Sequence, residues 1–330
     1  MMMSFVRQLI RLLVVSLMAG ECFAQMPSAG DQLLEQINSL SDIRSANQPF
    51  QLEADFTIQL TTPQSGHLSW KWSAKDLWRQ EITMGSFSEA QVRNGDSLFT
   101  SRNISFTPMH IFELQGLLSV SSIHPDQWQV KKAKQHGQEG SEECLELRSV
   151  PSRLHGWKRQ VCIDRASKDL LSDELQSESE LRRKEFGDYQ PFGDHRYPHT
   201  LKLAIDGSTV VKVTVRSLEA KSFDAALFTP PPNAVVRLAC ENIVPPVAIK
   251  TPDPSYPPSA LQSRVTGTSV VSLTVLADGS VDNVSLIGSS TRDMDAVTQQ
   301  IVKTWKFKPA MCGDVPVLAD IEVRVNFRLH

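Results

Sequence analysis

The feature that most constrains the fold is a long series of segments in which apolar and polar residues alternate, from Phe50 to Leu218. In the first segment, Phe50 to Leu60, every second side chain is apolar, which is the pattern of a strand with one buried face. Turn residues such as Asn94-Gly95 separate successive segments. The further predicted strands are 67–73, 77–83, 91–93, 97–101, 128–133, 144–150, 158–164, 170–175, 185–189, 197–205 and 210–218. Short strands that follow one another in this way indicate an antiparallel meander.

Two segments interrupt the alternation and have helical periodicity instead. Asp31 to Ala46 carries a single apolar stripe, which is typical of a helix packed on a core. That stripe consists of Leu33, Leu34, Ile37, Leu40 and Ile43. Met109 to Ile123 also has an apolar face and is predicted to be a helical insertion between strands. We therefore expect a large antiparallel sheet with one or two helices.

The chain after Lys250 has a different order of elements, namely strand, strand, helix, strand. Residues 269–276 and 281–287 are predicted strands, and Asp278-Gly279 between them is a strong hairpin signal because glycine accepts a positive φ. Residues 292–305 have helical spacing of Met294, Val297, Ile301 and Trp305. Residues 318–329 alternate again and indicate a half-buried or edge strand. This order predicts a small β-β-α-β domain.

Several separate residues in this segment resemble the C-terminal domain of the TonB family of energy transducers. They are Tyr256-Pro257, Gly267, Asp278-Gly279, Ser289-Ser290, Met294-Asp295, Trp305 to Pro309, Gly313 to Val317 and Val325 to Phe327. The family usually has Leu where Met294 stands, which leaves the role of that position in the core intact. The resemblance covers about a quarter of the chain.

The resemblance implies a binding function for the last strand. In TonB-type domains an extended segment of an outer-membrane receptor adds as a strand beside the C-terminal strand, and main-chain hydrogen bonds supply much of the affinity. By this resemblance the partner-binding edge consists of Val323, Arg324, Val325, Asn326, Phe327 and Arg328. The apolar members of this strand are expected to face the core whatever the partner, and Arg324, Asn326 and Arg328 are the expected exposed set.

The region before it resembles the LolA/LolB-type lipoprotein-carrier fold, an open half-barrel around an apolar hollow. The residues that carry the resemblance are Trp78 to Glu81, Arg93 to Asp96, Phe186 to Tyr189, Tyr197-Pro198, Phe223-Asp224 and Leu227-Phe228 before Pro230. These motifs are short, and an unrelated β-sandwich is the alternative architecture. The resemblance implies a second possible function, which is carriage of a lipid or of a lipoprotein acyl chain in the half-barrel.

The N-terminus has the features of a targeting segment. Arg7 and Arg11 precede the apolar run Leu12 to Gly20, and Cys22-Phe23-Ala24 offers small residues where a signal peptidase reads the chain, with cleavage before Gln25. The apolar run is much shorter than the roughly 20 residues that span a bilayer. The order Gly20-Glu21-Cys22 does not fit a lipoprotein signal. We expect an exported periplasmic protein, and the alternative is an inner-membrane anchor formed by an uncleaved N-terminus.

Cysteine usage agrees with export. Apart from Cys22 in the signal segment, the chain has four cysteines, Cys144, Cys162, Cys240 and Cys312. Cys144 and Cys162 lie in two strand-like runs, and a loop centred near Arg153 would place them opposite or one diagonal step apart, within bridging reach. A Cys144–Cys162 disulfide is therefore expected, which leaves Cys240 to pair with Cys312. Four free thiols are the alternative, and the spacing does not favour a zinc site.

Charge and motifs exclude several function classes. The formal net charge is −3, so nucleic acid is not an expected partner. The sequence has no G-x-S-x-G, H-E-x-x-H, P-loop or G-x-G-x-x-G motif, so we expect no enzyme and no cofactor. His195 and His199 have a spacing that could hold a metal, but we interpret them as a polar turn beside a strand and expect no metal site.

Together these patterns predict an α+β protein with an N-terminal antiparallel half-barrel sheet and a small β-β-α-β domain. The predicted segments are a signal peptide over 1–24, a LolA-like domain over 25–232, a Pro-rich linker over 233–258 and a TonB C-terminal-like domain over 259–330. The expected partner is a segment of an outer-membrane receptor or of another envelope protein, with a lipid or acyl ligand as a further possibility. A purely structural envelope protein is the remaining alternative.

Overall fold

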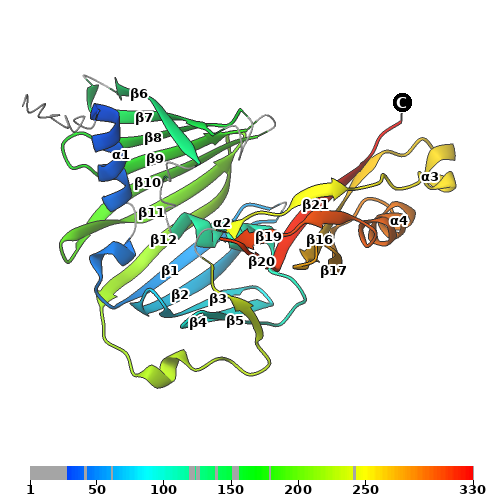
Figure 1. The fold of residues 1–330 in the computed structure, drawn as a ribbon, viewed down its shortest axis with the longest axis horizontal. Helices are drawn as coiled ribbons and strands as arrows, with labels where there is room; N and C mark the ends of the chain where they lie inside the picture. Colours follow the sequence, from blue (N-terminus) through cyan, green and yellow to red (C-terminus); the bar gives the residue numbers. More distant parts are fainter. Residues whose placement is uncertain are drawn as a thin grey trace, which may run out of the picture.

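A computed structural model describes residues 28–40, 43–60, 62–118, 123, 127–137, 140–150, 156–177, 180–240 and 243–329. The predicted signal segment, 1–24, lies outside the described residues. Within the described ranges, no helix combines the length and the hydrophobicity that crossing a bilayer demands. Figure 1 shows a large curved sheet with a narrower, elongated C-terminal part beside it.

The N-terminal part is built on one antiparallel sheet of 13 strands. The strands are β1 (Phe50–Ile58), β2 (Gln64–Ala74), β3 (Leu77–Met84), β4 (Phe87–Asn94), β5 (Ser97–Arg102), β6 (Trp128–His136), β7 (Glu142–Ser149), β8 (Lys158–Asp164), β9 (Leu170–Gln176), β10 (Leu181–Phe192), β11 (His195–Ile205), β12 (Ser208–Ala220) and β13 (Val235–Leu238). Their spatial order is β13-β5-β4-β3-β2-β1-β12-β11-β10-β9-β8-β7-β6. Because β1 pairs with β12, two meanders join side by side into one open sheet.

One face of this sheet is buried, as the alternation predicts. In β1 every second residue, from Phe50 to Ile58, is buried. The helical elements of this part are α1 (Ala29–Leu40), η1 (Ile43–Ala46), α2 (Met109–Leu118) and η3 (Ala225–Phe228). Leu33 and Ile37 of α1 and Leu114 of α2 belong to the same buried cluster as β1. Figure 1 shows α1 and α2 on the inner side of the curved sheet, so these helices fill the half-barrel.

The helix predicted over 31–46 is two elements rather than one. The α-helix ends at Leu40, and Ile43–Ala46 is a separate 3-10 turn whose Ile43 is still buried. Asn47 then adopts a left-handed conformation with φ 49°, which commonly terminates a helix. This reversal leads the chain into β1. Leu33, Ile37 and Ile43 are all buried, so the apolar spacing continues beyond the end of the α-helix.

The C-terminal part has its own sheet and its own core. Its main elements are α3 (Pro258–Gln262), β16 (Gly267–Val275), β17 (Val281–Gly288), α4 (Arg292–Val302) and β21 (Ala319–Phe327). The three strands are antiparallel in the order β17-β16-β21. Val271, Met294 and Phe327 are buried in a cluster separate from the N-terminal one. The α+β class, with a large antiparallel sheet and a small β-β-α-β unit, is thus confirmed.

The stretch between the two parts is more structured than a Pro-rich linker. It contains β13, which pairs with β5 at the edge of the large sheet. The remaining short strands are β14 (Ile243–Val244), β15 (Val247–Lys250), β18 (Lys306–Lys308), β19 (Ala310–Cys312) and β20 (Val315–Val317). β14 pairs with β19 and β15 with β18, so residues of the expected linker belong to both parts. The predicted boundaries at 232 and 258 remain predictions.

The helix predicted over 292–305 ends three residues early, at Val302. Thr304 closes the last turn, because its N–H and its hydroxyl both donate to the carbonyl of Ile301. The chain must then become extended to form β18 against β15. Trp305 therefore lies outside the helix, where its indole N–H donates to the carbonyl of Pro252 at 3.1 Å.

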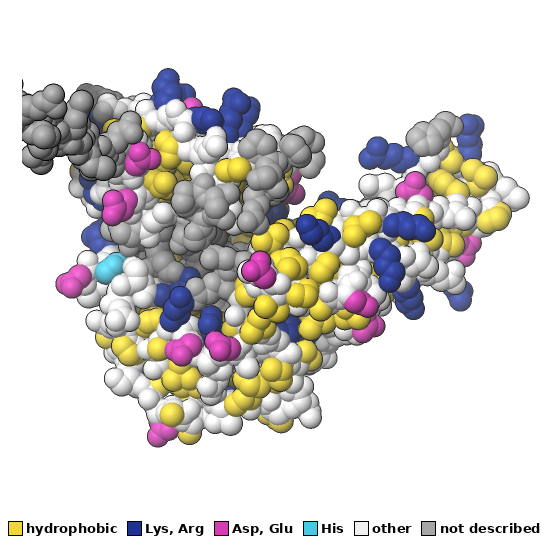
Figure 2. All heavy atoms as spheres, in the orientation of Figure 1, with side chains coloured by type: hydrophobic (Ala, Val, Ile, Leu, Met, Phe, Trp, Pro, Cys, Tyr) yellow, Lys and Arg dark blue, Asp and Glu magenta, His cyan; other side chains and the backbone are white. Residues whose placement is uncertain are grey.

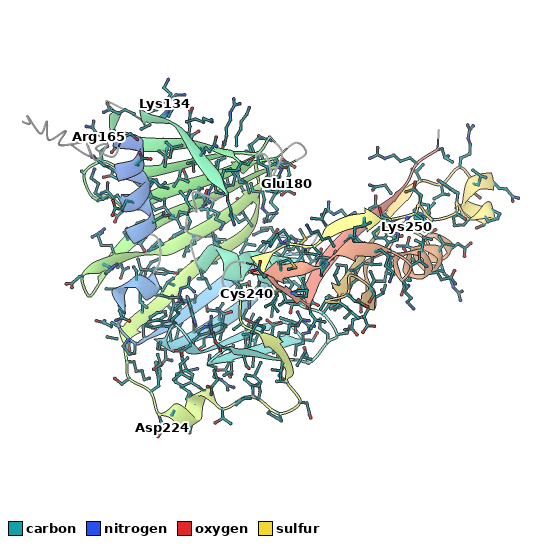
Figure 3. The ribbon with its side chains drawn as sticks, in the orientation of Figure 1. Lys134, Arg165, Glu180, Asp224, Cys240 and Lys250 are labelled. Atoms are coloured by element: carbon teal, nitrogen blue, oxygen red, sulfur yellow. A yellow bond between two sulfur atoms is a disulfide. The ribbon has the colours of Figure 1, made fainter. Side chains whose placement is uncertain are left out.

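Both predicted disulfides are present. Cys144 on β7 is directly opposite Cys162 on β8, so the bridge crosses neighbouring strands. Cys240 pairs with Cys312, which joins the segment after β13 to the end of β19. Figure 3 shows Cys240 where the large sheet meets the C-terminal part. The second bridge therefore holds the two parts of the molecule together at their junction.

Candidate functional site

The predicted partner-binding strand, β21, lies at the edge of its sheet. It pairs with β16 along its whole length, from Gly267 opposite Phe327 to Val275 opposite Ala319. Within the part of the chain that the structure describes, no strand is paired to its other side. An edge strand of this kind presents a row of backbone N–H and C=O groups to a further strand.

The side chains of β21 separate into two faces, as the sequence predicts. Val325 and Phe327 are buried in the C-terminal core, and Val323 packs against that core. Arg324 and Asn326 are exposed, and Arg328, just beyond the strand, is exposed too. The hydroxyl of Thr268 on β16 donates to Oδ1 of Asn326 at 2.7 Å. Five of the six predicted residues therefore lie on this edge strand and Arg328 follows it, and their role in binding stays a prediction.

A buried carboxylate fixes this edge relative to helix α4. Asp295 on α4 accepts hydrogen bonds from the hydroxyl of Ser269 at 2.6 Å, the hydroxyl of Ser289 at 2.5 Å and the N–H of Ser290 at 3.0 Å. Burial opposes ionisation of Asp295, but these hydrogen bonds outweigh it and lower its pKa. Because Ser269 is opposite Val325, the network anchors the middle of the candidate edge.

Two glycines of the TonB-like pattern have a steric explanation. A Cβ on Gly267 would lie 2.0 Å from Oγ of Ser290, within the loop that leads into α4. A Cβ on Gly279 would lie 1.9 Å from the carbonyl oxygen of Phe307, and Gly279 also has a φ of +78°. Both contacts bring loops close to the sheet that supports β21. The pattern residues at these positions therefore shape the domain rather than bind a partner.

The first half of β21 contacts the N-terminal part, which sequence reasoning did not predict. Oδ1 of Asp320 accepts from Nη2 of Arg237 on β13 at 2.9 Å and from the hydroxyl of Thr274 at 2.7 Å. Its Oδ2 lies 3.5 Å from Nη1 and Nη2 of Arg102 at the end of β5. The Asp320 side chain is 7% exposed. It thus joins three strands from both parts of the molecule.

Glu322 makes the next contact on the same face. Its Oε1 accepts a hydrogen bond from the backbone N–H of Met109, the first residue of α2, at 2.9 Å. Nearby, the Ser105 and Ser285 hydroxyls lie 2.9 Å apart and join the loop before α2 to β17. The only sequence signal for this interface is a change of sign along one strand face, from Asp320 and Glu322 to Arg324 and Arg328.

The two acids of this interface have opposite pKa shifts. Burial opposes ionisation of Asp320, but the hydrogen bond and the charge of Arg237, with Thr274 and Arg102, outweigh it and lower its pKa. Burial raises the pKa of Glu322, and the N–H of Met109 only partly compensates. Asp320 is therefore held as a carboxylate. At Glu322 the surrounding hydrogen bond and charges offset less of the cost of burying the carboxylate.

Helix α2 carries a chain of ion pairs beside Glu322. Glu113 accepts from Nη2 of Arg182 at 2.6 Å and lies 2.5 Å from Nδ1 of His110. The hydrogen bond with Glu113 raises the pKa of His110 against the effect of burial. The Glu113 side chain is 6% exposed. The first turns of α2 are thus attached to β10 on one side and to β21 on the other.

The interior of the half-barrel is the second candidate site. Phe50 stacks on Trp72 with ring centroids 5.5 Å apart and meets Trp70 edge to face at 5.2 Å. Within the described residues, the indole N–H groups of Trp70 and Trp72 are buried without a hydrogen-bond partner. The side chains of α2, among them Ile111, Leu114 and Leu117, occupy the space over this sheet face. The interior is therefore apolar and aromatic, and α2 packs within it.

A depression of about 620 Å³ lies elsewhere, over strands β1, β2, β3 and β12. Its polar lining includes Asp55, His67 and Arg216. His67 lies 3.0 Å from Oδ1 of Asp55 and 2.8 Å from Oε2 of Glu53, and Nε of Arg216 donates to Asp55 at 2.5 Å. Because these groups neutralise one another, we interpret the depression as a solvated sheet face rather than a binding site.

The two histidines considered as metal ligands lie on one strand, β11. Residues four apart in an extended strand are separated by about 13 Å, too far for two imidazoles to share one ion. His195 instead places Nε2 3.2 Å from the hydroxyl of Ser45 in η1. The contact between His195 and Ser45 therefore links the sheet to the turn before β1.

The junction between the two parts exposes several apolar side chains. Figure 2 shows them gathered where the C-terminal part leaves the large sheet and along that part. They include Val235, Val236, Ile243, Val247, Ile249 and Val315. They come from β13, β14 and β15 in the connection and from β20, which pairs with β19 in the C-terminal part. A grouping of this kind is typical of a surface that contacts another molecule.

Comparison with known proteins separates the two parts of the chain. Residues 252–329 match the family model described as Gram-negative bacterial TonB protein C-terminal. Over 78 residues the chain is 35% identical to protein TonB of Xanthomonas campestris pv. campestris (strain B100), which is 23% of this chain and 35% of that protein. Over 83 residues it is 32% identical to protein tonB2 of Pseudomonas aeruginosa, 25% of this chain and 31% of that protein. The chain spans about a third of the length of the curated relatives it matches.

The large sheet has structural neighbours of a different kind. The crystal structure of a LolA superfamily protein from Nitrosomonas europaea covers 61% of this chain and 97% of its own, at 12% identity and a TM-score of 0.43. The sequence comparison assigns residues 252–329, and not the chain as a whole, to the TonB C-terminal family.

Proposed function

We propose that this chain is an exported binding protein of the periplasm that takes part in energy-coupled transmembrane transport. Its C-terminal domain would receive an extended segment of an outer-membrane receptor, or of another envelope protein, as an additional strand beside β21. The family match over residues 252–329 supports this proposal. The observation that carries it is the edge position of β21, which is paired to β16 and, in the described chain, to no other strand.

The chemistry of this edge favours an extended peptide over a small ligand. Strand addition draws its affinity from main-chain hydrogen bonds, and an edge strand supplies those groups in a regular row. Val325 and Phe327 are committed to the core, so they hold the strand in place. Arg324 and Arg328 remain exposed beside the edge and can contact the side chains of a bound segment.

Site-specific photo-crosslinking in intact cells tests the proposal. A photoreactive phenylalanine analogue at Asn326 should trap an envelope protein, and mass spectrometry should place the cross-link in an extended segment of that protein. The same analogue at Asp282, an exposed residue of β17, is the matched control. Equal trapping from both positions, or none from Asn326, would contradict strand addition at β21.

A pair of proline substitutions sharpens the test. In an edge strand, backbone N–H groups of adjacent residues point to opposite sides, so one points to β16 and the next to the free edge. Val325→Pro and Arg324→Pro therefore remove donors on opposite sides of β21. One of the two variants should lose cross-linking from Asn326 while its circular dichroism is unchanged. If cross-linking survives in the variant that keeps its fold, the free edge is not used.

The half-barrel interior supports a second candidate function, carriage of a lipid or of an acyl chain. The specific observation is the pair of buried indole N–H groups of Trp70 and Trp72, which a polar atom of a ligand could satisfy in an otherwise apolar site. Native mass spectrometry of the full chain purified from the periplasm tests it. A lipid-sized mass that co-purifies, and that Trp70→Phe with Trp72→Phe reduces, supports carriage. A protein of bare polypeptide mass opposes it.

A further inference from the structure

The contacts of Asp320 and Glu322 join β21 to three elements of the N-terminal part. Asp320 reaches Arg237 on β13 and Arg102 on β5, and Glu322 reaches the first residue of α2. Side chains two apart on a strand share a face, so both acids act from the same side of β21. The interface is polar and charged, whereas each part keeps its own apolar core.

Helix α2 receives at its N-terminus a partner that its own sequence does not supply. The first turn of a helix leaves N–H groups that need acceptors, and a side chain just before the helix usually provides one. Here the preceding residue is Pro108, whose side chain has no acceptor. Glu322 of the C-terminal part accepts from the N–H of Met109 instead.

The rest of α2 is held by the N-terminal sheet. Nζ of Lys184 on β10 donates to the carbonyl of Gly116 at 2.8 Å, and the Tyr197 hydroxyl on β11 donates to the carbonyl of Leu118 at 3.0 Å. Ile111, Leu114 and Leu117 face the apolar interior and are fully buried. The described contacts thus attach the C-terminal end of α2 to the N-terminal part, while its N-terminal half is attached to β10 through Glu113 and to β21 through Glu322.

The Cys240–Cys312 disulfide keeps the two parts close even without these contacts. Leu238 at the end of β13 pairs with Ser97 of β5, and Ala239 donates its N–H to the carbonyl of Asp96. The next residue, Cys240, is bonded to β19 of the C-terminal part. The tether makes docking an intramolecular event at high effective concentration, so a few polar contacts are enough to hold the docked state.

We propose that Asp320 and Glu322 form a latch through which the C-terminal part holds α2 in place over the apolar interior of the half-barrel. In the latched state Asp320 binds Arg237 and Arg102, and Glu322 caps α2. When the latch is released, the disulfide retains the C-terminal part, α2 loses its cap, and the first turn of the helix opens toward solvent. This inference does not depend on the proposed binding of a partner strand, because it concerns contacts within the chain.

Amide hydrogen exchange of the full chain tests the latch. Glu322→Ala should speed exchange of a peptide that covers residues 109–118 by about five- to tenfold, the local effect of losing a helix cap. Asp320→Asn and Arg237→Gln should speed exchange of the same peptide, although the described hydrogen bonds and ion pairs of both residues are to elements other than α2. Peptides from β1 and β12 should keep their wild-type rates, which shows that the N-terminal core remains folded.

Matched substitutions provide the controls. Asp282→Asn removes an exposed acid from β17, and Glu219→Gln removes an exposed acid from β12. Both should leave exchange of residues 109–118 unchanged. The latch is wrong if Glu322→Ala leaves this exchange at the wild-type rate. It is equally wrong if Glu322→Ala acts alone and Asp320→Asn and Arg237→Gln have no effect, because Glu322 would then be a local cap without any coupling to docking.

Discussion

The two halves of β21 have the same alternating pattern but different surroundings. In the first half, Asp320 and Glu322 are covered by the N-terminal part and paired with groups from β5, β13 and α2. In the second half, the residues on the same face, Arg324 and Asn326, are exposed. One strand therefore provides an internal docking surface and, next to it, an open edge. The difference teaches that alternation assigns side chains to a face of the strand, but it does not tell which of them another part of the chain will cover.

A substitution on the core-facing side of the second half of β21 should have the largest effect on stability. Phe327 is buried and meets Tyr256 edge to face at 5.6 Å between ring centroids. Phe327→Ala should destabilise the C-terminal part by about 4 kcal/mol, because it leaves a large cavity in a small core. Urea denaturation followed by amide hydrogen exchange of peptides from β16 and β21 measures this loss. A change below about 1 kcal/mol would show that the strand end is not part of the core.

The Cys240–Cys312 disulfide, which joins the two parts of the molecule, should have the next largest effect on stability. Replacing both Cys240 and Cys312 by Ser should cost about 3 kcal/mol of C-terminal stability, since the bridge closes a long loop in the unfolded chain. It should also increase the separation of the two parts in solution, measured by small-angle X-ray scattering. Replacing Cys144 and Cys162 is the matched control, because that bridge lies within the large sheet. It should leave the separation unchanged.

The docked half itself should show a smaller effect. Asp320→Asn should destabilise the docked state by about 2 kcal/mol, because Arg102 and Arg237 lose the buried carboxylate with which they pair. A double-mutant cycle with Arg237→Gln should give a coupling of about 1 kcal/mol or more. Arg324→Gln, on the exposed half of the same face, should change stability by less than about 0.5 kcal/mol. Equal effects at 320 and 324 would remove the distinction between the halves.

The smallest expected effect is a pH dependence with two opposing parts. The pKa of Asp320 is lowered, so its stabilising contribution is full above its unfolded pKa and is lost as the pH falls through the folded pKa. The pKa of Glu322 is raised by burial, so its contribution is full below its unfolded pKa and is lost as the pH rises through the folded pKa. His110, Glu113 and Arg324 are the charged groups that act on Glu322.

Each part of this dependence can be removed separately. Thermal unfolding between pH 3 and pH 7 should show that Asp320→Asn reduces the loss of stability at the acid end. Glu322→Gln should reduce the decline toward neutral pH. If both variants keep the wild-type profile, the titration of other groups dominates and the interface acids are not responsible.

Much of the fold could be predicted because one physical signal dominates each element. The strand predicted over 158–164 coincides with β8, and the alternation of β1 matches its burial residue by residue. The disulfide between Cys144 and Cys162 followed from the hairpin register, because directly opposed residues on adjacent strands are within bridging reach. The helix predicted to reach Trp305 was too long, since apolar spacing cannot distinguish a core residue inside a helix from one just beyond it.

The sequence by itself determined the two cores, the antiparallel meander, the β-β-α-β order and the exposed face of the second half of β21, because burial periodicity is a local property of the chain. Only the tertiary structure decided that β13 completes the large sheet, that Arg237 and Arg102 meet at Asp320, and that Glu322 caps α2. Those contacts join residues far apart in the sequence through single polar groups. No period or spacing encodes such a pairing, so it is visible only once both parts have folded and docked.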